Sequence, residues 1–136
     1  MTDAPLPAVS IALVDGDRVL LVRRGRAPAK GLFAFPGGRV EDGETLEQAV
    51  RRELSEETGL ATGPVALVET LDIEREGSGA SFRLHVFTAS HIGGSLVAGD
   101  DADQAAWFSL AEMEALPVIP SVVAVARALL VSHPTR

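Results

Sequence analysis

Residues 38–60 read GRVEDGETLEQAVRRELSEETGL and constrain this chain more than any other stretch. Their apolar residues recur every four positions, which predicts a helix from about Thr45 to Thr58 with one face on a core. Gly59 stands where a left-handed residue commonly ends a helix. A glycine-rich turn, Pro36-Gly37-Gly38, leads into the stretch and allows backbone to approach a ligand closely.

Three glutamates near the end of the expected helix form an unfavourable charge pattern. Glu53 shares a helix face with Glu56 and Glu57, and like charges at this spacing repel. Carboxylates there also face the negative end of the helix dipole. Such a pattern indicates a functional site, and hard oxygen ligands favour Mg²⁺, or Mn²⁺, over Zn²⁺. The alternative is a solvated acidic helix face.

The spacing of these residues resembles the signature of the Nudix family. Gly38 is followed after five residues by Glu44, and after seven more by residues 52–60, RELSEETGL, so that every specified position is filled. The resemblance implies the Nudix fold over residues 1–136: an α/β/α sandwich with a mixed sheet between helices. It also implies a Mg²⁺-dependent pyrophosphohydrolase that cleaves a nucleoside diphosphate linked to another group.

The resemblance also implies roles for residues inside the signature. Glu56 and Glu57, with Glu53 nearby, are expected to hold the metal. A backbone carbonyl at the glycine turn, from Gly37 or Gly38, is an expected further ligand. Glu44 and Arg52 are expected to form an ion pair that ties the loop to the helix. Gly59 is expected to end the helix.

Glu53 is the first candidate for the general base, directly or through a bound water. In related proteins a loop before the tryptophan often supplies an acidic group. A glutamate is expected three residues before Trp107, but this chain has Gln104. Either Asp101 or Asp103 takes that role, or Glu53 acts alone. The alternative for the two aspartates is a solvated acidic loop.

Arginines near the turn are candidates to contact substrate phosphate: Arg23 and Arg24 after an expected strand, and Arg39 after the glycine pair. For any single arginine, a solvated basic loop end is an equal interpretation. Phe33 is left open between stacking on a base and packing in the core, whereas Phe35 is expected in the core.

The rest of the chain reads as alternating strands followed by helices. The expected elements are a hairpin over residues 8–24, a short strand over 32–35, and a second hairpin from strands 65–75 and 81–89. A polar loop over 91–106 is expected to precede a strand that begins at Trp107. A short helix capped by Ser109 and a buried helix over residues 121–131 end the series.

Composition indicates a single folded domain and limits the kinds of partner that the protein can bind. The chain has 136 residues, no cysteine, 46% hydrophobic residues and a net charge of −7, which suits one folded domain in a reducing cytoplasm. Neither a signal peptide nor a membrane span is expected. The acidic balance argues against nucleic acid as partner. The expected partner is a small nucleoside diphosphate derivative, received by bound metal and a few arginines, and the resemblance is compatible with a homodimer.

Within the family, the pattern resembles ADP-ribose pyrophosphatases, so an ADP-ribose or nucleoside diphosphate sugar substrate is expected first. The alternative enzyme would convert a nucleoside triphosphate, including an oxidised one, to the monophosphate and pyrophosphate. A third interpretation is a nucleotide-sensing module without turnover. The complete carboxylate set favours an enzyme, because a pure binder has no need of it.

Overall fold

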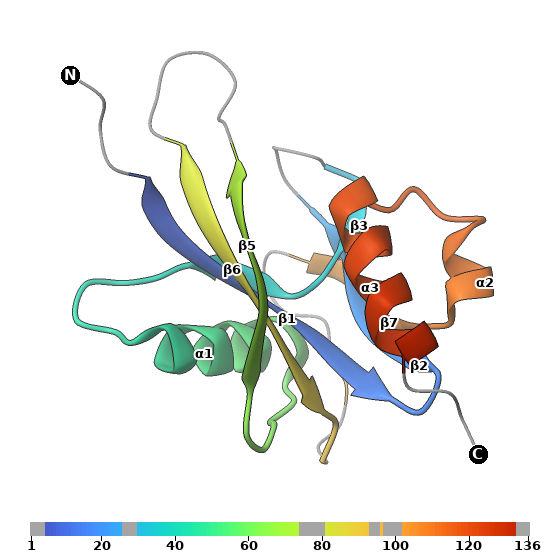
Figure 1. Cartoon of the computed structure of the whole chain (residues 1–136), viewed down its shortest axis with the longest axis horizontal. Coiled ribbons are helices and arrows are strands. Elements are labelled where there is room, and N and C mark those ends of the chain that lie inside the picture. Colours follow the sequence, from blue (N-terminus) through green and yellow to red (C-terminus); the bar gives the residue numbers. More distant parts are fainter. Residues whose placement is uncertain (1–4, 26–29, 74–80, 93–95, 97–101, 133–136) are drawn as a thin grey trace.

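The computed structural model describes residues 5–25, 30–73, 81–92, 96 and 102–132, with only the backbone at 102–103 and 131–132 (Figure 1). A mixed sheet is flanked by helices, as predicted. The strands are β1 (Leu6–Asp15), β2 (Arg18–Arg24), β3 (Phe33–Ala34), β4 (Gly37–Arg39), β5 (Ala66–Ile73), β6 (Phe82–Ser90) and β7 (Ala102–Phe108). The helices are α1 (Leu46–Thr58), α2 (Leu110–Met113) and α3 (Pro120–Ser132).

The central strand β1 changes neighbours along its length. It pairs with β6 in parallel over Leu6 to Val14, and with β2 only at its carboxyl end. At its amino end the short strand β4 takes the place of β2, with Val9 opposite Gly38 and Ser10 opposite Gly37. The strand order is β3-β2-β1-β6-β5, and β7 also pairs with β2, along nearly its whole length. The sheet therefore opens between β2 and the amino end of β1.

Two apolar clusters hold the helices against the two faces of the sheet. The side chains of β1 alternate between them, because successive residues of a strand point to opposite faces. Val9, Ile11 and Leu13 pack with α1, whereas Ala12 packs on the side of α2 and α3. Figure 1 shows α1 beneath β1 and β6, and α3 beside β2 and β3. The alternation confirms the predicted α/β/α layering.

Local signals set both ends of α1. The Thr45 side chain accepts from the backbone N–H of Gln48, whose own side chain accepts from the Thr45 N–H. At the other end Gly59 adopts a left-handed conformation with φ 73° and donates to the Ser55 carbonyl. No basic residue occupies the last turn of α1. The helix was therefore predicted within one residue of its ends.

Two expectations about the chain path were wrong. The predicted glycine-rich turn was Pro36-Gly37-Gly38, but Gly37–Arg39 form β4, because the unpaired edge of β1 supplies a hydrogen-bonding partner. Trp107 lies near the end of a strand instead of beginning one: β7 starts at Ala102, within the predicted loop, ends at Phe108 and pairs with β2. The final helix begins at Pro120, one residue before its predicted start. The capped helix at Ser109 is present, with Ser109 and Glu112 in reciprocal hydrogen bonds.

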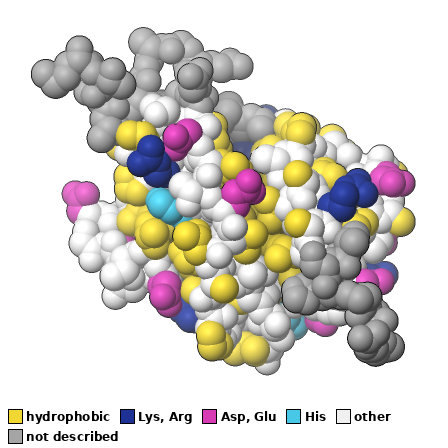
Figure 2. Space-filling model, in the orientation of Figure 1, with side chains coloured by type: hydrophobic (Ala, Val, Ile, Leu, Met, Phe, Trp, Pro, Cys, Tyr) yellow, Lys and Arg dark blue, Asp and Glu magenta, His cyan; other side chains and the backbone are white. Residues whose placement is uncertain are grey.

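The outer edge of the sheet is strand β5, which pairs only with β6 in the described part of the chain and is exposed along most of its length. Hydrophobic atoms reach the surface in the centre of the view in Figure 2, where β5 runs in Figure 1. Leu67 and Ile73 are 55% and 41% exposed. No helix within the described residues is long and apolar enough to cross a membrane.

Substitution of Gly37 by alanine is expected to destabilise the fold. A Cβ at this position would lie 2.8 Å from Ser10 Cα and would overlap the Val9 carbonyl oxygen, and backbone cannot move aside cheaply. We expect a loss of about 1–3 kcal/mol or more in the free energy of unfolding, measured by denaturant titration. Gly63→Ala is the matched control, because a Cβ there would meet only an Ile92 methyl group at 3.9 Å, an ordinary van der Waals contact. Equal stability of the two variants would contradict the crowding.

Candidate active site

Two carboxylates of α1 contact the glycine segment of β4. The Gly37 N–H donates to Glu57 Oε2 over 2.8 Å. A Cβ built on Gly38 would lie 2.6 Å from Glu53 Cδ and would overlap one of its carboxylate oxygens. Glu53 and Glu57 are one helical turn apart and their side chains also contact each other. The absence of a side chain at Gly38 lets the Glu53 carboxylate lie this close to β4.

The pair is electrostatically unfavourable as it stands. The pKa of Glu57 is raised to about 8, first by burial and then by the charge of Glu53, while the Gly37 N–H and Arg24 act in the opposite direction. Burial also raises the pKa of Glu53, although its hydrogen bond from Arg52 opposes the shift. Two half-buried anions in contact favour either a shared proton or a bound cation.

Arg52 ties the loop before α1 to the helix. Its Nε and Nη2 donate to the two oxygens of Glu44 over 2.7 and 3.0 Å, in the bidentate geometry of a strong ion pair. Its Nη2 also donates to the Arg39 carbonyl, and its Nη1 to Glu53 Oε1. The hydrogen bond from Arg52 holds the pKa of Glu44 below its usual value. The network fixes the position of Glu53 relative to β4.

The third predicted metal ligand, Glu56, lies apart from the other two. Its side chain is 60% exposed and accepts from Arg52 Nη1 over 3.1 Å. Among the residues whose positions are described, no three acidic or histidine side chains are grouped closely enough to hold an ion. The structure thus brings Glu53 and Glu57 together with the glycine segment, and leaves Glu56 facing solvent and Arg52.

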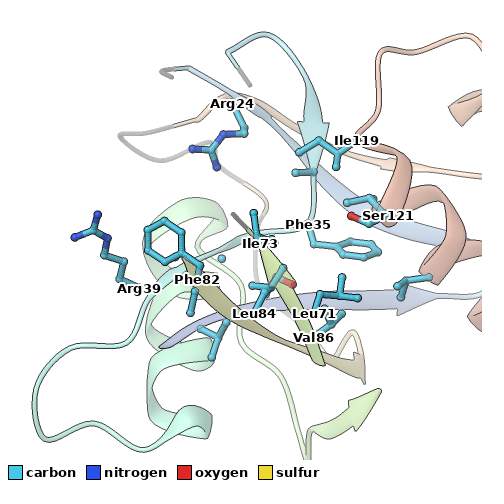
Figure 3. Close-up of a pocket in the computed structure, with 18 residues that line it drawn as sticks. Arg24, Phe35, Arg39, Leu71, Ile73, Phe82, Leu84, Val86, Ile119 and Ser121 are labelled. Carbon is cyan, nitrogen blue, oxygen red and sulfur yellow. The ribbon is translucent and has the colours of Figure 1, made fainter. Parts of the chain in front are cut away.

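A cavity of about 620 Å³ opens on the other side of the glycine segment. Gly37 and Gly38 line it, so this segment touches the carboxylates on one side and the cavity on the other. Figure 3 shows Arg24 and Arg39 at its outer end and apolar side chains from the sheet and α3 around the rest. The apolar walls include Phe35, Leu71, Phe82, Leu84, Val86, Ile119, Val122 and Val125.

The candidate substrate residues divide between cavity and core. Arg24 and Arg39 line the cavity, and the Arg39 guanidinium lies 5.2 Å from the centroid of the Phe82 ring. Arg23 pairs with Phe33 and Gln104 across the sheet and lies outside the cavity lining.

Of the two roles left open for Phe33, base stacking and core packing, the structure supports core packing. This residue is 5% exposed and packs edge-on against Phe108, with ring centroids 5.4 Å apart. Its ring belongs to the core and presents no face to a base. Phe35, assigned to the core, is buried and also forms part of the cavity wall.

The structure neither supports nor contradicts the two aspartates considered as alternative general bases. Asp101 lies outside the described residues, and of Asp103 only the backbone, in β7, is described. Gln104 follows in β7 opposite Arg23.

Most of the cavity wall was not singled out from the sequence. Its signal was the two-residue alternation of Phe82, Leu84 and Val86, which places these side chains on one face of β6.

The raised pKa of Glu57 predicts a pH-dependent stability. The unfolded chain releases this proton near pH 4.5 and the folded chain near pH 8, so ionisation weakens the fold as pH rises between these values. Without divalent metal, we expect the free energy of unfolding to fall from pH 6 to pH 8, by at most about 1.4 kcal/mol per unit for one proton. Denaturant titration of Glu57→Gln should show a flatter profile, and an unchanged slope would contradict the assignment.

The family model for the NUDIX domain matches residues 4–128 of this chain. An ADP-ribose pyrophosphatase of Methanocaldococcus jannaschii is 44% identical over 107 residues, which cover 76% of this chain and 63% of that protein. This chain thus spans less than two thirds of the length of the first curated relatives it matches.

Solved structures agree with this match. A MutT NUDIX hydrolase of Burkholderia pseudomallei aligns with a TM-score of 0.81 and 28% identity, over 91% of this chain and 96% of that one. A bifunctional NMN adenylyltransferase/ADP ribose pyrophosphatase of Francisella tularensis, crystallised with AMP and a manganese ion, aligns with a TM-score of 0.77 and 25% identity, over 95% and 42% of the two chains. The chain belongs to the Nudix family.

Proposed function

We propose that this chain is a divalent-metal-dependent pyrophosphohydrolase of nucleoside diphosphate derivatives, with an ADP-ribose-type compound as substrate. The observation that carries the proposal is the position of Gly37 and Gly38 between the cavity and the carboxylates of α1. A nucleoside in the cavity would extend its diphosphate along this segment toward Glu53 and Glu57. The archaeal relative, named as an ADP-ribose pyrophosphatase, supports the choice of substrate.

The cavity suits the two ends of such a substrate. Its apolar walls, which include Phe35 and Leu84, can cover the flat faces of a base. Arg24 and Arg39 at its outer end provide positive charge for phosphate oxygens. An overall net charge of −7 would otherwise repel a polyanion, so these local cations are needed at the site.

The carboxylates suit a divalent cation. Glu53 and Glu57 provide hard oxygen donors, and because burial raises the pKa of both, a bound cation would stabilise their charged forms. They would hold the ion, and a glycine carbonyl and Glu56, once released from Arg52 Nη1, would be further donors. Bound Mg²⁺ or Mn²⁺ would neutralise charge on the diphosphate oxygens.

Glu53 is assigned the proton transfer. Water attacks one phosphorus of the diphosphate, the bridging P–O bond breaks, and Glu53 takes the proton of the attacking water. Arg52 holds Glu53 Oε1 at 3.0 Å and so restricts the carboxylate to the side of Gly38. Products from ADP-ribose are AMP and ribose 5-phosphate.

The test is product analysis on a panel of substrates with Mg²⁺, with Mn²⁺ and with chelator. The panel holds ADP-ribose, nucleoside diphosphate sugars, dinucleoside polyphosphates, and ordinary and oxidised nucleoside triphosphates. Metal-dependent release of AMP and ribose 5-phosphate is the expected result. Release of pyrophosphate from a triphosphate would replace the proposed substrate class. Metal and nucleotide binding without turnover of any compound would instead indicate a sensing module.

A further inference from the structure

One polar group in the cavity is not explained by the metal site or the arginines. Ser10 is 7% exposed, and in the described part of the chain its Oγ is buried without a hydrogen-bond partner. Other buried hydroxyls are paired: Thr58 donates to the Leu54 carbonyl. A buried hydroxyl without a partner is unfavourable, so its retention calls for an explanation.

The pairing of β1 places the Ser10 side chain at the cavity. Ser10 lies between Gly37 of β4 and Val86 of β6, and residues directly opposite on paired strands point to the same face. Val86 lines the cavity, as do Ser10 and its neighbour two positions away, Ala8. The alternate residues Val9 and Ile11 belong to the cluster under α1. Ser10 therefore forms part of the cavity floor, on the face covered by α3, with its hydroxyl just beneath the accessible surface.

Small residues around Ser10 leave room for a ligand. Ala8 and Ala34, both with small side chains, line the same cavity. The surrounding walls are mostly aliphatic and aromatic, and offer few polar groups to a ligand. A planar group that enters between these walls would present its polar edge to the floor. There the Ser10 hydroxyl can both donate and accept a hydrogen bond.

We propose that Ser10 is a specificity-determining residue whose hydroxyl binds the polar edge of the nucleobase in the cavity. The inference rests on the proposed function in one respect, that a nucleoside occupies the cavity, and it does not depend on turnover. A base with a donor or acceptor at this edge satisfies the hydroxyl. A group with a purely apolar edge leaves it unpaired and is rejected.

The test compares Ser10→Ala with Thr88→Val, a matched loss of a hydroxyl. Thr88 Oγ1 donates to the Ala12 carbonyl over 2.9 Å, and Thr88 does not line the cavity. Calorimetric titration with AMP, GMP, CMP and UMP in the presence of Mg²⁺ identifies the nucleotide that binds best. For that nucleotide we expect Ser10→Ala to weaken binding about tenfold and Thr88→Val to leave it unchanged.

Stability gives a second readout with opposite signs. Ser10→Ala removes an unpaired hydroxyl and is expected not to lower the melting temperature, whereas Thr88→Val removes a paired one and is expected to lower it. A merely structural serine would behave in the reverse way. Weaker nucleotide binding by a variant that is at least as stable as the parent is the signature of a ligand-binding hydroxyl.

Other ligands locate the contact on the base. The 2′-deoxy and 3′-deoxy forms of the nucleotide should show the same tenfold effect, and pyrophosphate, which has no nucleoside, should show none. Unchanged nucleotide binding by Ser10→Ala would overturn the proposal. So would loss of the effect with a deoxyribose, an equal loss for pyrophosphate, or no binding of any of the four nucleotides. Failure of the proposed function would appear separately, as binding without turnover of ADP-ribose.

Discussion

Replacement of Glu53 by glutamine is expected to reduce kcat about 10²–10⁴-fold, the range typical for removal of a general base. Glutamine keeps an oxygen that can accept the hydrogen bond from Arg52 Nη1, so the side chain should stay beside Gly38. It removes one of two half-buried negative charges and should not lower the melting temperature. Nucleotide binding should persist, because the cavity walls do not include Glu53.

The control for this experiment is Glu47→Gln. Glu47 belongs to the first turn of the same helix and is exposed, so the two variants lose the same charge at opposite ends of α1. Initial rates and equilibrium binding of the same nucleotide should be measured for both proteins. A near-normal kcat for Glu53→Gln would show that Glu53 is not the general base. Asp101 and Asp103 would then be the next candidates.

Substitution of Gly38 by alanine is expected to lower kcat/KM about 10²-fold with little loss of stability. The added methyl group would overlap the Glu53 carboxylate, and this is the far end of a flexible side chain. The carboxylate can move aside at small cost to the fold, but it then leaves its place beside Glu57. A displacement of about 1 Å in a reacting group is enough for a loss of this size.

Comparison with its neighbour makes this prediction specific. Gly37→Ala places the methyl group against backbone and should unfold the protein more readily, whereas Gly38→Ala should melt within a few degrees of Gly63→Ala. Rates and melting curves of the three variants separate the effects. Gly38→Ala with full activity would show that Glu53 does not need its present position.

How much could be read from the sequence differs between elements. The course of α1 was predicted because its signals are local: a capping residue, a four-residue repeat and a glycine at the end. The Arg52–Glu44 contact followed from the family resemblance and is present in the structure. The short strand β4 was missed, because three residues carry no periodic signal and pair only where β1 leaves β2.

The cavity could not be predicted for a related reason. Its walls come from β1, β5, β6 and α3, which are distant in sequence, and only the folded sheet brings them together. Phe33 and Phe35 illustrate the limit. Both alternate with Ala34 in sequence and both are buried in the same apolar cluster, yet Phe35 also lines the cavity and Phe33 does not. The unpaired Ser10 hydroxyl likewise has no sequence signal, since serine is common in strands of every kind.

The exposed edge strand β5 has a consequence for how such a protein can change. Leu71 and Ile73 of β5 line the cavity, yet among the described residues this strand has a neighbour on only one side, and it is exposed along most of its length. Because Leu71 packs on the α3 side of the sheet and α1 covers the other face, changes here are expected to leave α1 and its anchoring to β4 in place. Selectivity can therefore drift, or be redirected by directed evolution at β5, while the proposed hydrolytic site is inherited intact.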